Sequence, residues 1–218
     1  MIVDDKVFDF IYTIAMRDAT LQKAYELIGY KTSKGAKKPD DYKKEELLKN
    51  STAKDIIREY IDNIIAGNNP NFYDVEKDVE KSFDSFIKGK KYLSSFTFGN
   101  CQKLINMTVK YFYIVTYSDP TIRSHFNDCH CPMDKIMIER VIRELDKVNV
   151  TLDDINNKNR LNIEIPKKKK ISKGYLKNSW SKIEQKDHKQ YDLFQAAVKD
   201  LAKQQGVSPI EYDYLMWK

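Results

Sequence analysis

Apolar residues recur at three- and four-residue steps along most of this chain, which is the pattern of helices with one buried face. The clearest stripes fall at 8–28, 56–65, 75–87, 136–145 and 183–201. Glycine, proline and asparagine separate the stripes, as in the Gly-Asn-Asn-Pro run that ends the second one. The pattern therefore predicts a series of amphipathic helices joined by loops.

Polar side chains and prolines mark the points at which these helices are expected to begin. The candidate N-caps are Asp4 or Asp5, Ser51 or Thr52, Thr151 or Asp153, Ser179 and Ser208. Thr20 is expected to restart the first helix after a break near Asp18. Pro132 is expected in the first turn of a helix in which Asp134 adds a carboxylate favoured by the helix dipole.

Residues 100–117 carry apolar side chains almost all round the predicted helix, so we expect this helix to be central and mostly buried.

One segment departs from the helical pattern. Residues 161–166 alternate apolar and polar positions, which is typical of a short strand. The fold class is therefore all-α, a single globular domain of roughly seven to nine helices with at most one short strand pair.

The same pattern suggests how the chain is organised. We expect a helical core at 1–157, a basic loop at 158–178 and a C-terminal helical unit at 179–218 that packs on the core. Within the core, residues 96–145 form a hairpin-like unit, and they contain all three cysteines and two of the three histidines.

The composition agrees with a helical globular protein. A chain of 218 residues with 41% hydrophobic residues can bury a sizeable core, and only 7 glycines and 6 prolines argue against a loop-rich β fold. Three cysteines make a disulfide framework improbable, so a cytoplasmic location is expected. No signal peptide and no run of apolar residues long enough to span a membrane is evident.

The positive charge is concentrated in one segment. The chain has a net charge of +6, but residues 158–182 alone have a net charge of +8, and the remainder is slightly acidic. Lysines mixed with aromatic residues suit a nucleic-acid backbone and exposed bases, so we expect nucleic acid, with DNA preferred, as the partner. The candidate nucleic-acid-binding residues are Lys167, Lys168, Lys169, Lys170, Lys173, Tyr175, Lys177 and Trp180. No basic amphipathic helix points to a membrane surface, and no cofactor is expected.

A cluster of soft ligands raises the question of a metal site. His125, Cys129, His130 and Cys131 lie within seven residues, and Cys101 lies upstream. Zinc ligands usually have two to four residues between paired members, so that the chain can wrap the ion. Residues 129–131 are consecutive and their side chains diverge, so we expect buried cysteines and no metal site.

Arg123 and His130 are separated by six residues, and Ser124 follows the arginine. This spacing resembles the Arg-x(4–6)-His motif of the HEPN-type RNases, which are all-helical proteins of toxin and antiphage defence systems. The resemblance implies RNA cleavage with Arg123 and His130 as the catalytic residues.

A second resemblance covers residues 96–145. A glycine-containing turn at 96–100 leads into a helix that bears Lys103, and Pro132-Met133-Asp134 precedes a helix that continues Ile-Glu-Arg-Val. This order resembles the helix-hairpin-helix DNA glycosylase superfamily, whose hairpin carries a Gly-x-Gly where this chain has one glycine. The resemblance implies an all-α fold, hairpin amides that bind DNA phosphates, and base excision in DNA repair.

By that resemblance Asp134 is the catalytic acid and Lys103 the amine that attacks the sugar, while an aromatic residue such as Trp180 stacks on a flipped base. Three functions remain open from the sequence: a glycosylase-like enzyme, an RNase-like enzyme, and a binding protein without catalysis. The sequence alone does not decide whether the protein is an enzyme.

Overall fold

The computed structural model describes residues 4–20, 46–88, 90, 96–165, 176, 180–183 and 188–216 of the chain. In these residues the protein is an all-α single domain with nine α-helices and no strands, which confirms the predicted fold class. Within the described part, no helix is long and apolar enough to cross a bilayer.

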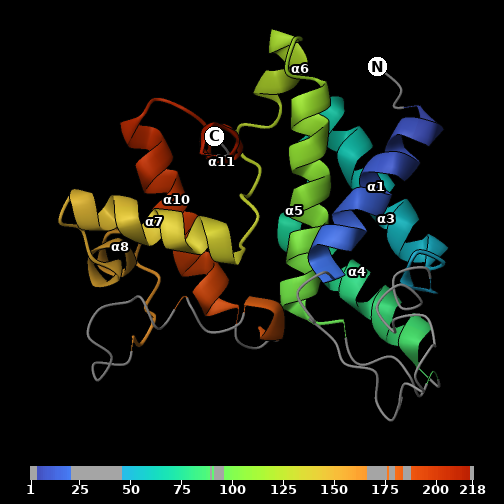
Figure 1. Ribbon diagram of the computed structural model, residues 1–218, viewed down its shortest axis with the longest axis horizontal. Coiled ribbons are helices and arrows are strands. Elements are labelled where there is room, and N and C mark those ends of the chain that lie inside the picture. The colour runs from blue at the N-terminus through green and yellow to red at the C-terminus, as the bar shows by residue number, and fades with distance from the viewer. Residues whose placement is uncertain are drawn as a thin grey trace, which may run out of the picture.

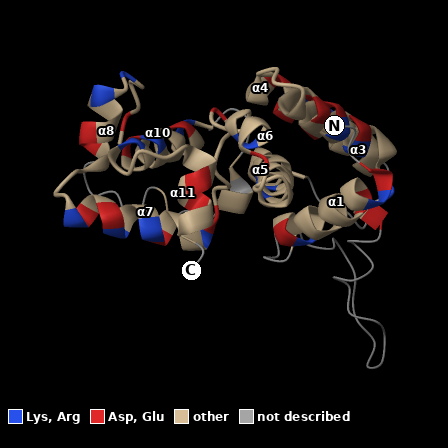
Figure 2. Cartoon of the chain, turned by 90° about the horizontal axis from the view of Figure 1, so that it is seen from above, with Lys and Arg blue, Asp and Glu red and all other residues tan. Residues whose placement is uncertain are grey.

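The helices form two groups on either side of one central helix, α5 (Phe98–Val115) (Figure 1). The first group packs against α5 and consists of α1 (Asp5–Thr20), α3 (Ser51–Ile65) and α4 (Phe72–Ile87). The second group consists of α7 (Lys135–Lys147), α8 (Leu152–Lys158), α10 (Lys189–Gln204) and α11 (Pro209–Leu215). The short helices α6 (Pro120–Ser124) and η1 (Trp180–Lys182) lie between the groups, and η1 and α11 contact α5. Seen from above, the two groups are clearly separate, and basic and acidic residues alternate along α7 (Figure 2).

Two predicted helix starts in the first group are wrong. α1 runs without a break through Asp18 to Thr20, because Ala15, Met16 and Ala19 continue its buried face and the Thr20 hydroxyl donates back to the Met16 carbonyl at 2.8 Å. α3 is capped by Asn50, not by Ser51 or Thr52. The Asn50 Oδ1 accepts from the Ala53 amide at 3.3 Å and also from the Ser82 hydroxyl at 3.0 Å.

Asn50 therefore caps α3 and joins it to α4, a tertiary role that local sequence does not reveal.

The start of α7 also differs from the prediction. Asp134 is the N-cap, and its side chain accepts from the Met137 amide at 2.9 Å. Pro132 lies two residues before the cap, outside the helix. The carboxylate thus acts as a direct cap for the orphan amides and not only as a charge in the first turn.

The expected short strand at 161–166 does not form in its described part, 161–165. The side chain of Asn156 takes the place of a neighbouring strand: its Oδ1 accepts from the Ile163 amide at 3.1 Å, and its Nδ2 donates to the Ile163 carbonyl at 2.7 Å. Asn162 has φ +54°, which is incompatible with a strand. The expected cap Ser179 lies outside the described residues, and the C-terminal unit begins as η1 followed by α10 from Lys189.

Helix α5 is buried almost all round, as predicted, but part of what it buries is polar. Gln102, Lys103, Asn106 and Lys110 are each at most 5% exposed. Lys110 Nζ lies 2.7 Å from Asp213 Oδ2 of α11, and burial raises the pKa of Asp213 despite this partner. The polar residues face the second group, so hydrogen bonds and ion pairs, and not apolar contacts alone, join the two groups of helices.

Candidate functional site

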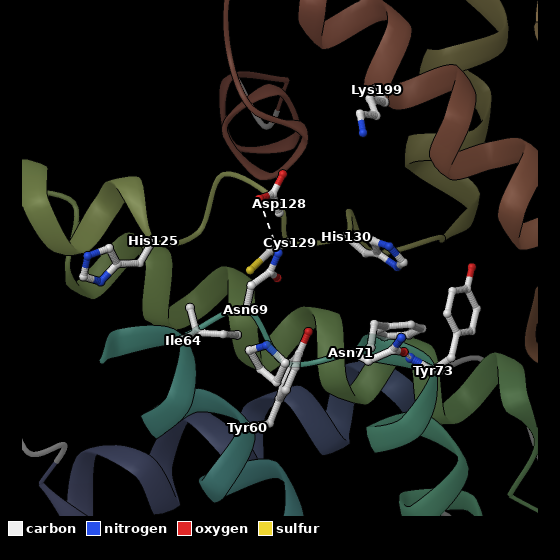
Figure 3. Close-up of a pocket in the computed structure, with 12 residues that line it drawn as sticks. Tyr60, Ile64, Asn69, Asn71, Tyr73, His125, Asp128, Cys129, His130 and Lys199 are labelled. Atoms are coloured by element: carbon white, nitrogen blue, oxygen red, sulfur yellow. Dashed lines mark hydrogen bonds between the residues drawn. The ribbon is translucent and has the colours of Figure 1, made fainter. Parts of the chain in front are cut away.

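A cavity of about 420 Å³ lies between the first group, the segment that joins α6 to α7, and α10 (Figure 3). Tyr60 of α3 and Tyr73 of the first turn of α4 contribute from one side. Asp128 and His130 come from the α6–α7 segment, and Lys199 reaches in from α10 on the side opposite Tyr60 (Figure 3). The cavity has the size of a small-molecule site, and four separate segments of the chain build it.

Three polar groups at this cavity have no partner among the described residues: the Tyr60 hydroxyl, the His130 Nε2 atom and the Lys199 ammonium group. Within the described part of the chain, the Asp128 carboxylate has one hydrogen-bond partner, the Asn69 side-chain amide, at a long 3.5 Å. Polar groups that line a cavity without a protein partner are available to water or to a ligand. The cavity therefore offers several hydrogen-bonding groups to a guest molecule.

The His130 ring is held by a hydrogen bond at its edge and by a neighbouring aromatic ring. Its Nδ1 lies 2.9 Å from the Tyr191 hydroxyl, and its ring centroid lies 4.6 Å from that of Phe72. Burial, together with the positive charge of Lys199, lowers the pKa of His130 from 6.5 to about 4. The imidazole is therefore neutral at pH 7.

The backbone beside His130 is fixed by a side-chain amide. Gln195 of α10 accepts from the Cys131 amide at 3.0 Å and donates to the Cys131 carbonyl at 2.6 Å. This pair of bonds ties the α6–α7 segment to the second group. The position of His130 in the cavity is therefore set in part by α10, through Gln195 and Tyr191.

Tyr73 is oriented by an acidic partner. Its hydroxyl donates to Asp192, whose other carboxylate oxygen lies 2.8 Å from His188 Nδ1. Burial and the carboxylate raise the pKa of Tyr73, and burial raises the pKa of Tyr60. Both phenols are thus neutral. Each has a hydroxyl group that can form hydrogen bonds and an aromatic ring at the cavity.

The structure brings together three residues that the glycosylase resemblance picks out, but away from this cavity. Lys103 Nζ lies 3.5 Å from Asp134 Oδ2 and 4.6 Å from the centre of the Trp180 ring. Lys103 is 5% exposed and Trp180 is 4% exposed, so neither presents an open surface to a flipped base. Lys103 of α5 and Asp134 at the start of α7 therefore form an ion pair, and the Trp180 ring of η1 lies against it.

The turn before α5 is similarly closed. The Gly99 amide donates to the Ile183 carbonyl at 3.1 Å, and a Cβ added to Gly99 would lie 1.9 Å from the Trp180 carbonyl oxygen. Thr97 and Asn100 satisfy each other in a capping box. The glycine is therefore needed for the close approach of η1, and the amides at this helix start are occupied by protein.

The two residues of the RNase resemblance, Arg123 and His130, do not share the cavity. His130 lines the cavity, whereas the Arg123 guanidinium lies over the Tyr117 ring, 5.0 Å from its centre, and Arg123 is not among the lining residues. Of the predicted nucleic-acid-binding residues, only Trp180 is described. Lys167, Lys168, Lys169, Lys170, Lys173, Tyr175 and Lys177 lie outside the described residues.

The cysteines behave as buried thiols. Burial raises the pKa of Cys129 to about 12 and the pKa values of Cys101 and Cys131 well above the ordinary value. Across the described ranges, no three histidine, cysteine or acidic side chains are arranged to hold a metal ion.

Sequence reasoning missed Tyr60, Tyr73, Asp128 and Lys199 as candidate site residues. Each lies on a helix or turn with an ordinary pattern, and no spacing links them along the chain. Of the lining residues, His125, Cys129 and His130 had been singled out, as a possible cluster of soft ligands and, for His130, as an RNase residue. The fold and the cavity define a class: in its described residues the chain is an all-α single-domain protein with a polar and aromatic cavity between two groups of helices. Searches of family models, curated proteins and solved structures find no match to this chain.

Proposed function

We propose that this protein binds nucleotides, and that the cavity lined by Tyr60, His130 and Lys199 receives one nucleotide unit of a single-stranded nucleic acid. The observation that carries the proposal is the set of three unpartnered polar groups that these residues bring to one cavity. A ligand rich in oxygen atoms satisfies such donors, and a phosphate suits the Lys199 ammonium group best.

The aromatic side chains at the cavity favour a ligand that also contains an aromatic ring. Tyr60 and Tyr73 line the cavity beside His130, and Phe72 packs against the His130 ring. Every nucleobase has a π-face, and stacking on aromatic residues stabilises single-stranded nucleic acid without strong sequence preference. A base has to leave the duplex stack to enter a cavity of this size, so a single strand is the expected form.

The distribution of charge supports a polyanion as the source of the nucleotide. The net charge of +8 at 158–182 stands against a slightly acidic remainder. A basic segment of this kind favours a long phosphate backbone over an isolated small molecule. The binding is therefore expected to weaken with salt.

The test compares two lysines of α10. Both lysines are exposed, but Lys199 lines the cavity, whereas Lys203, one turn further on, does not. Fluorescence anisotropy with a labelled single strand of about 12 nucleotides, as DNA and as RNA, measures the affinity. We expect Lys199→Gln to weaken binding about tenfold, the size of one charge-assisted hydrogen bond, and Lys203→Gln to change it by less than about twofold.

Competition by unlabelled nucleoside monophosphates shows whether the ligand is a nucleotide within a strand or a free nucleotide. If the mononucleotide displaces the strand only at far higher concentration, the strand is the ligand. If it competes as well as the strand, a free nucleotide is the ligand of the cavity. Equal effects of the two lysine substitutions, or no binding of either ligand, would contradict the proposal.

A further inference from the structure

The orientation of His130 is determined by a chain of buried side chains that begins at a residue outside the cavity lining. Gln102 of α5 is the first member. Its Nε2 donates to the Met133 carbonyl at 3.0 Å and to the Gly99 carbonyl at 3.0 Å, and its Oε1 accepts from the Met133 amide at 3.2 Å. Because a backbone N–H only donates and a carbonyl only accepts, these three bonds fix which end of the Gln102 amide is oxygen.

Asn106, one turn further along α5, takes its orientation from Gln102. The Gln102 Oε1 can only accept, so the Asn106 atom 3.3 Å away must be the donor Nδ2. The same Nδ2 lies 2.8 Å from the Tyr191 hydroxyl oxygen. Tyr191 therefore receives a hydrogen bond from Asn106.

The hydrogen bond from Asn106 to Tyr191 also determines the direction of the hydrogen bond between Tyr191 and His130. Its hydroxyl oxygen accepts from Asn106, and its single hydrogen is left for His130 Nδ1 at 2.9 Å. Tyr191 is fully buried, and no other acceptor for this hydrogen is found among the described residues. A Nδ1–H tautomer of His130 would leave the hydroxyl hydrogen buried without a partner, which is unfavourable.

We infer that Gln102, Asn106 and Tyr191 hold His130 in its neutral Nε2–H form, so that the cavity presents a fixed hydrogen-bond donor to an acceptor atom of the ligand. The acceptor is a carbonyl or phosphoryl oxygen. Tyr191 is a positioning residue, because it acts on the ligand only through His130. The choice of a nucleotide as that ligand rests on the proposed function, whereas the tautomer rests on the hydrogen bonds alone.

The chain of hydrogen bonds from Gln102 through Asn106 and Tyr191 to His130, called the relay below, determines which ligand atoms the cavity accepts. A neutral imidazole with a fixed N–H donates one directed bond, and it rejects an N–H or O–H donor placed at the same point. The Lys199 ammonium group supplies the positive charge at this cavity, which also contains the Asp128 carboxylate, and His130 supplies a hydrogen bond of fixed direction.

The chain offers a matched control for removing the Tyr191 hydroxyl. Tyr212 is also fully buried, and its hydroxyl has no hydrogen-bond partner among the described residues. Tyr191→Phe and Tyr212→Phe each delete one buried hydroxyl. Only Tyr191→Phe removes a bond to His130.

The experiment is a long-range ¹H–¹⁵N correlation spectrum of the ¹⁵N-labelled full chain, with His130 assigned by its loss in His130→Asn. We expect His130 to be Nε2–H in the wild type and in Tyr212→Phe, and to become a mixture of tautomers in Tyr191→Phe. A Nδ1–H tautomer in the wild type, or an unchanged tautomer in Tyr191→Phe, would overturn the inference.

Anisotropy with the labelled single strand then links the tautomer to recognition. We expect Tyr191→Phe to weaken binding about fivefold and Tyr212→Phe to leave it unchanged. If the spectrum shows the expected tautomers but no strand or nucleotide binds, the proposed function fails and the relay stands. If the strand binds but the wild-type tautomer is Nδ1–H, the relay fails and the proposed function stands.

Discussion

The unusual pKa of His130 predicts that acid destabilises the fold through this one residue. In the folded state His130 stays neutral down to about pH 4, because burial and Lys199 lower its pKa, whereas in the unfolded chain it takes up a proton near the ordinary value of 6.5. Above that ordinary value both states are neutral, and His130 has no effect on stability. As the pH falls below it, the unfolded state binds the additional proton and the folded state loses stability.

The size of the effect follows from the two pKa values. At about pH 4.5 the unfolded imidazole is almost fully protonated and the folded one only about one quarter, which corresponds to about 2.5 kcal/mol. His130→Asn removes the titration while its Oδ1 can still accept a hydrogen bond from Tyr191. The difference between wild type and variant isolates His130 from every other titrating group.

Urea unfolding followed by circular dichroism measures this difference at several pH values between about 7 and 4.5. We expect the free energy of unfolding of the wild type to fall by about 2.5 kcal/mol more than that of His130→Asn. If the two curves stay parallel within about 0.5 kcal/mol, burial does not lower the pKa of His130, because His130 then titrates alike in both states.

Two further predictions concern the buried contacts of α5. Gly99→Ala places a Cβ 1.9 Å from the Trp180 carbonyl and should destabilise the fold by at least about 3 kcal/mol in urea unfolding, whereas Gly206→Ala, at φ +69° with open space around it, should cost only about 1 kcal/mol. Equal costs would contradict the claim that the close approach of the Trp180 carbonyl makes Gly99 necessary, because Gly99 has no positive φ to explain a cost of the same size. Lys110→Met should cost about 3–5 kcal/mol because it leaves the Asp213 carboxylate buried without its partner, and Lys110→Met combined with Asp213→Leu should recover most of this loss. A double variant no more stable than the single one would contradict the pairing.

The fold class could be predicted from the sequence because amphipathic periodicity survives in each helix by itself. The central place of α5 was predictable because its apolar residues lie almost all round the helix, whereas the burial of its polar residues Gln102, Lys103, Asn106 and Lys110 was not. The helix starts were less predictable. Asn50 caps α3 because Ser82 of another helix also bonds to it, and a tertiary contact of this kind has no local signature.

The candidate site could be predicted only in part. His130 stood out by its spacing from Arg123, but the structure gives it Lys199, Tyr60 and Tyr191 as neighbours. Those residues are distant in the chain and look ordinary in their own helices. Lys103 and Asp134 do meet, as the resemblance implied, but the ion pair is nearly closed to solvent, and burial is a property that spacing cannot reveal.

If a nucleotide unit occupies the cavity between the two groups of helices, a crystal structure of the chain with a short single-stranded oligonucleotide will show it there. We expect a phosphate oxygen within hydrogen-bonding distance of Lys199 Nζ, a ligand acceptor atom at His130 Nε2, and a base beside Tyr60 or Tyr73. An oligonucleotide bound elsewhere on the protein, with this cavity empty, would contradict it.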